Sequence, residues 1–118
     1  MQLLTSDLKN RLLRNGRASA YAAASGRDFD PLPVVKLFTP DAQATWLLTE
    51  LDPACAWRAF GLCDLGFGAP ELGFVDLREL SDVRGPLGLS VERDLHFVAT
   101  KPLSQYAEEA DQLSRIAA

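Results

Sequence analysis

Two carboxylates and the only histidine of the chain alternate in the segment 92–97, which reads E-R-D-L-H-F. If this segment is a strand, Glu92, Asp94 and His96 lie on one face. Such side chains can ligate a divalent metal or act as acid and base. Their Cβ atoms would spread over about 13 Å, so a metal site would need carboxylates from a neighbouring strand. The three are therefore weak metal candidates, and we expect a polar sheet face with no catalytic residue, metal or cofactor.

Other catalytic patterns are weaker still. Cys63 could act as a nucleophile with His96 as its base, but it alternates with Gly61 and Leu65, which favours an apolar position. His96 is the only histidine, which excludes a two-histidine metal site and favours a structural role for this residue. The loop 66–68 has no following Lys and Ser or Thr of a phosphate-binding loop, so it predicts a hairpin turn.

Several polar and aromatic residues are candidates for binding a partner. Arg93 shares a face with apolar neighbours, so we expect its head group to be partly buried and paired with Glu71 or Asp64, with anion binding as the alternative. Trp46 and Trp57 would pack in the core or, if exposed, stack on a base or a partner side chain. The candidate binding residues are Trp46, Glu50, Glu71, Arg84, Arg93, Asp94 and His96.

The elements that must position these residues follow from the periodicity of apolar side chains. An N-terminal helix over 1–16 is predicted to end at Asn15-Gly16, followed by a variable linker over 17–33 whose alanine-rich part could be helix or loop. A period of two begins at Val34 and predicts the sheet over 34–98, with strands at 34–38, 44–51, 57–65, 72–75 and 92–98. Asp76 is expected to cap a short helix over 77–84, and the C-terminal helix spans 102–117.

Short connections between these strands favour hairpins over crossovers. We therefore predict a single α+β domain over 1–118, with an antiparallel sheet of about five strands. The N-terminal, short middle and C-terminal helices should pack on it, on one face.

Composition is that of a globular protein, with 118 residues, 47% hydrophobic residues and a net charge of −4. The charge is uneven, because residues 1–27 carry five basic residues and one acidic one, and the rest carry seven and fifteen. An acidic body disfavours nucleic acid, although the basic N-terminal segment could contact it weakly. Two cysteines and the lack of a long apolar run predict a cytoplasmic protein with no membrane contact.

Six motifs occur in a fixed order along the chain: K-L-F-T-P from Lys36, T-W from Thr45 with T-E-L-D from Thr49, P-E-L-G-F from Pro70, V-R-G from Val83 and V-E-R-D-L-H-F from Val91. In these motifs the chain resembles a bacterial family known as domain of unknown function 2958, over residues 1–107. The resemblance implies a small protein often encoded on plasmids and integrated conjugative elements. It implies no established activity.

These observations favour a small non-enzymatic module that binds another protein. One version is an acidic accessory or inhibitory, anti-defence-like factor of a mobile genetic element, whose carboxylates occupy a partner's nucleic-acid-binding surface. One alternative is a nucleic-acid-binding accessory protein that uses the basic N-terminal segment and an exposed tryptophan. Another is a metal-dependent hydrolase that uses Glu92, Asp94 and His96. The oligomeric state stays open.

Overall fold

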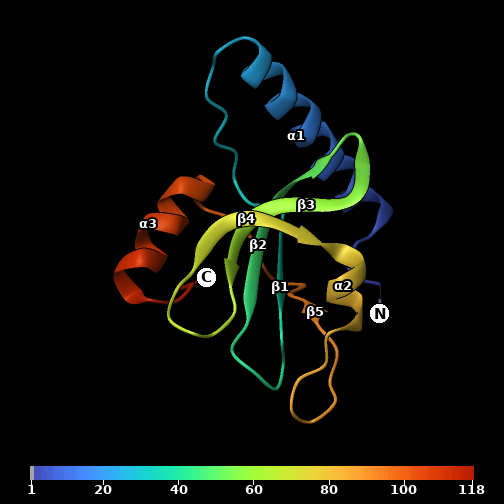
Figure 1. Cartoon of the computed structure of the whole chain (residues 1–118), viewed down its shortest axis with the longest axis vertical. Helices are drawn as coiled ribbons and strands as arrows, with labels where there is room; N and C mark the ends of the chain where they lie inside the picture. Colours follow the sequence, from blue (N-terminus) through green and yellow to red (C-terminus); the bar gives the residue numbers. More distant parts are fainter. Residues whose placement is uncertain (1) are drawn as a thin grey trace.

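Alternating apolar side chains fold the middle of the chain into consecutive antiparallel strands. The computed structural model describes residues 2–118, and its five-stranded sheet has the order β4-β3-β2-β1-β5, as Figure 1 shows. All strand pairs are antiparallel, which confirms the predicted α+β class and antiparallel sheet. The strands are β1 Val35–Phe38, β2 Thr45–Asp52, β3 Cys55–Asp64, β4 Glu71–Asp76 and β5 Glu92–Arg93, and the helices are α1 Ser6–Ala24, α2 Leu77–Asp82 and α3 Leu103–Leu113.

The helices cover both faces of the sheet, so the expectation of one covered face is wrong. Trp46 and Leu48 belong to the core cluster that contains Leu12 of α1 and Leu80 of α2. The intervening Leu47 belongs instead to a second cluster, under α3. Since consecutive side chains of a strand point to opposite faces, the buried run in β2 requires cover on both sides. Figure 1 accordingly places α3 across the sheet from α2.

Helix α1 passes the predicted stop at Asn15-Gly16 and continues through the alanine tract to Ala24. Both residues serve packing against β2. The Asn15 side chain donates to the Thr49 carbonyl at 2.9 Å. A Cβ at Gly16 would lie 1.8 Å from the Leu51 carbonyl oxygen, so only glycine permits this close approach. The predicted helix start includes Met1, which lies outside the described residues.

The segment after α2 is less regular than predicted. Strand β5 contains only Glu92 and Arg93, so the expected strand over 92–98 is wrong. Its pairing with β1 ends because Asp94 starts a turn: the Asp94 carboxylate accepts from the His96 amide at 2.9 Å. The loop before β5 is held by Asp41, whose carboxylate accepts from the Leu87 amide at 2.7 Å.

The two later helices begin near the predicted residues and end earlier. Asp76 caps α2 through the Arg78 amide, and α2 ends at Asp82. Helix α3 ends before Ser114, which has a left-handed backbone (φ 59°). The C-terminal residues then return to the sheet, where Asp64 accepts from the Ile116 amide at 3.0 Å. None of the helices within residues 2–118 has the length and apolar character needed to cross a membrane.

Candidate functional site

The two tryptophans differ in exposure, and the one selected from the sequence is buried. Trp46 is 3% exposed and packs in the core, so it is not available to stack on a base or a partner side chain. Trp57 is 44% exposed, near the start of β3. Position along the chain could have signalled this difference, because Trp46 precedes two leucines within a strand whereas Trp57 closely follows the Asp52-Pro53 turn.

Arg93 anchors the N-terminal segment. Its Nη1 donates to the carbonyl oxygens of Gln2 and Leu3, at 2.9 and 2.7 Å. The expected pairing with Glu71 or Asp64 is therefore wrong. Asp64 is instead buried and accepts from the backbone amides of Gly66 and Ile116. Carbonyl oxygens satisfy the partly buried guanidinium in place of a carboxylate.

The three weak metal candidates do not form a ligand cluster. Glu92 pairs with Phe38 across the β1–β5 ladder, Asp94 lies 3.6 Å from the Lys36 ammonium, and His96 is exposed beyond the end of β5. Throughout residues 2–118 there is no group of three His, Cys, Asp or Glu side chains that could hold a metal. The strand needed to align these side chains ends at Arg93, so the geometric premise for the site is wrong.

Cys63 is a poor candidate for a nucleophile. Burial, with the nearby charge of Glu71 as a smaller cause, raises the pKa of its thiol to about 11. A thiol with this pKa is almost fully protonated at neutral pH, and the thiolate is the nucleophilic form. Both Cys63 and Cys55 are free cysteines.

The remaining candidates do not form one surface. Half-buried Glu50 has a raised pKa, mainly because of burial, with a hydrogen bond from Ser19 opposing the shift and Asp52 adding to it. Glu71 is exposed at the start of β4. Arg84 is also exposed, but it follows α2 and lines a groove against the N-terminal segment.

Strand β4 forms an apolar edge that sequence reasoning missed. It is the last strand of the sheet on the side away from β5. Leu72 and Phe74 pair with Leu62 and Phe60 of β3, on the face covered by α3. Helix α3 does not extend over them, since Leu72 is 49% and Phe74 is 56% exposed. The sequence did contain one sign of an unprotected sheet edge: this strand has six residues and neither proline nor lysine.

Acidic side chains lie on the same side of the sheet as this edge. Glu108 and Asp111 are exposed on α3, whose buried residues pack on the Leu47 side of the sheet. The neighbouring Glu109 is neutralised by Lys101 at 2.7 Å. This side of the molecule therefore combines an apolar strand with an acidic helix.

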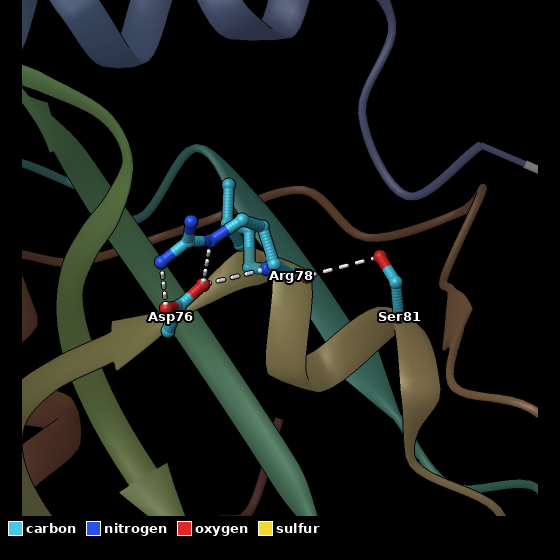
Figure 2. A network of polar contacts seen from close by, with 4 residues as sticks. Asp76, Arg78 and Ser81 are labelled. Carbon is cyan, nitrogen blue, oxygen red and sulfur yellow. Dashed lines mark hydrogen bonds and ion pairs between the residues drawn. The ribbon is translucent and has the colours of Figure 1, made fainter.

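The opposite side carries a basic groove of about 600 Å³. Arg78 lines it and forms a two-point ion pair with Asp76, with the shorter contact at 2.8 Å, while its guanidinium lies 4.2 Å from the centre of the Trp57 ring. Figure 2 shows Arg78 turned toward Asp76, with Ser81 further along α2. Arg84 donates to the carbonyl oxygens of Ser81 and Val83. The groove brings together Lys9, Arg78 and Arg84, which are distant in sequence.

The geometry defines a class of protein: an α+β domain with a five-stranded antiparallel sheet, covered by α1 and α2 on one face and α3 on the other. Residues 3–117 match the family described as Protein of unknown function (DUF2958), and the chain belongs to this family. Comparison with curated proteins and with solved structures gave no match in either case.

Proposed function

We propose that this chain is a non-enzymatic module that binds another protein through the edge strand β4. The observation that supports the proposal is the exposure of Leu72 and Phe74 on a strand that ends the sheet. Within residues 2–118 nothing pairs with the outer edge of β4. Its outward backbone groups are therefore free to pair with a strand from a partner.

Apart from the charged residues at its two ends, Glu71 and Asp76, the edge lacks the features that normally prevent such pairing. Natural sheets protect their edges with proline, lysine, bulges or very short strands. Strand β4 pairs with β3 over six residues without a register shift, whereas the β2–β3 ladder contains two. At the other edge, β5 has only two residues. The sheet is thus protected at one edge and left open at the other.

Charge indicates the chemistry of the partner. The exposed acids of α3 and Glu71 of β4 accompany the apolar side chains, so a complementary surface would be basic around an apolar centre. Nucleic-acid-binding proteins have such basic surfaces. On this proposal the chain is an acidic accessory or inhibitory factor of a mobile genetic element, and it acts in the cytoplasm.

Affinity capture with matched variants tests this function. The intact chain, Leu72→Lys and Leu89→Lys would be immobilised and exposed to an extract of the source cells at low and moderate salt. Leu89 is 47% exposed in the loop after α2, so the control changes an equally exposed leucine away from β4. We expect the intact chain and Leu89→Lys to retain a partner that Leu72→Lys does not retain. No partner at either salt concentration, or equal loss with both variants, would refute the proposal.

Nucleic acid is the second candidate, favoured by one observation. Lys9, Arg11, Arg14 and Arg17 are all exposed on α1, and none forms an ion pair within the described part of the chain. Gel-shift titrations with single-stranded DNA, double-stranded DNA and RNA test it, because contacts to phosphates weaken as salt rises. No binding, or binding insensitive to salt, would remove this candidate.

A further inference from the structure

The groove between the N-terminal segment and α2 has only cationic charge among its lining residues. Lys9 comes from α1, Arg78 from α2, and Arg84 from the segment after α2. The uncharged polar residues on its walls are Gln2, Ser81 and Ser90, and Trp57 adds a partly exposed indole ring. The fold therefore collects positive charge from three positions in a chain whose net charge is −4.

Most of this positive charge is not neutralised. Asp76 pairs with Arg78. Lys9 and Arg84 have no acidic partner among residues 2–118. Two backbone carbonyls hold one nitrogen of the Arg84 guanidinium and leave its other nitrogen groups free. Like charges gathered in a concave site raise the local positive potential, and an anion bound there would lower it.

We propose that this groove binds a small ligand that carries clustered phosphate groups, either a free polyphosphate or a nucleotide. Guanidinium and ammonium groups form strong charge-assisted hydrogen bonds with phosphate oxygens. A volume of about 600 Å³ is typical of small-molecule sites and suits a ligand of nucleotide size. A base could stack on the Arg78 guanidinium, which lies 4.2 Å from the centre of the Trp57 ring, and such stacking distinguishes a nucleotide from a free polyphosphate.

This site goes beyond the proposed protein-binding function and does not depend on it. The core beneath the groove is the cluster under α1 and α2, whereas Leu72 and Phe74 lie on the α3 face. Trp57 and Phe74 do line one shallow pocket between the two regions, but Leu72 does not line the groove, and Lys9 and Arg84 lie outside β4. Variants of Leu72 and variants of Lys9 or Arg84 therefore test partner capture and phosphate binding separately.

Calorimetric titration with tripolyphosphate and with ATP tests the site. Both probes should bind the intact chain, and the affinity should fall as salt rises. Arg84→Gln and Lys9→Gln should each weaken binding by about tenfold, the loss of roughly one charge-assisted contact. Arg115→Gln is the control, since Arg115 is an exposed cation beyond the end of α3. The unfolding temperature of each variant shows whether it is folded.

Trp57→Leu separates the two sources of phosphate. Weaker ATP binding with unchanged tripolyphosphate binding identifies a nucleotide, and affinities of both probes that do not change from those of the intact chain identify the polyphosphate group alone. Failure of the intact chain to bind either probe at low-millimolar concentration would overturn the proposal. Equal weakening by Arg115→Gln would overturn it too, as would tighter binding of a single-stranded oligonucleotide than of either probe.

Discussion

The two sides of the sheet differ in how completely their helices cover it. On one side α1 runs against β2, with Gly16 in contact with the backbone, and the surface is basic and grooved. On the other side α3 covers Leu47 and Leu62 but leaves Leu72 and Phe74 exposed. The comparison shows that the same sheet can present a concave charged site on one face and an open apolar strand at its edge.

Gly16→Ala should have the largest effect on stability, because the new Cβ would lie 1.8 Å from the Leu51 carbonyl oxygen. Separating α1 from the sheet to make room should cost about 2 kcal/mol or more. Gly73→Ala on β4 is the matched control: nothing lies within 4 Å of its Cβ position, so the free energy of unfolding should change little. Urea unfolding of both variants measures the difference. Equal destabilisation by the two substitutions would show that α1 and β4 do not differ in how tightly they are packed.

Arg93→Met should have the second largest effect on stability, because it releases the segment that leads into α1. The variant loses the hydrogen bonds to the Gln2 and Leu3 carbonyls, at a cost of about 1.5 kcal/mol for a charged donor. Loss of this anchor should let the start of α1 open more often, so the Leu8 and Lys9 amides, which donate to Thr5, should exchange hydrogen faster while β4 stays unchanged. Hydrogen exchange followed by peptide mass analysis gives the comparison. Unchanged exchange at Leu8 and Lys9 would show that Arg93 does not anchor the segment that leads into α1.

The sequence was sufficient to predict the order of helices and strands and the antiparallel sheet, since alternation over β1 to β4 is local information. It was not sufficient to predict the side on which α3 packs, because Leu47 and its neighbours are apolar toward both faces. Gly16 was interpreted as a helix stop because its contact is with Leu51, 35 positions away. The binding candidates were selected for chemical type, whereas exposure depends on packing: Trp46 proved buried and Trp57 exposed.

Glu50→Gln should change the pH dependence of stability by a smaller amount. Burial raises the pKa of Glu50 in the folded state, so the folded chain binds a proton more readily there than the unfolded chain. The contribution of Glu50 to stability is therefore fully present below the ordinary carboxyl pKa and is lost as pH rises through the raised value. The variant should melt higher than the intact chain at neutral pH, with little difference in acid. A lower melting temperature at neutral pH would contradict this interpretation of Glu50.

Glu71→Gln should have the smallest effect and act through Cys63. Removal of the Glu71 charge lowers the pKa of the Cys63 thiol from about 11, although burial, its main cause, remains. Alkylation of Cys63 at mildly alkaline pH should then become a few-fold faster. Mass spectrometry separates modification of Cys63 from that of Cys55. A rate that does not change would show that burial alone controls this thiol.

Hydrogen exchange of the chain in complex with its captured partner tests the β4 surface most directly. If the partner adds a strand, the backbone amides of Glu71–Asp76 should exchange more slowly in the complex than in the free chain. The amides of α1 should be unaffected. Protection confined to α1, with β4 exchanging at the same rate in both states, would contradict the account.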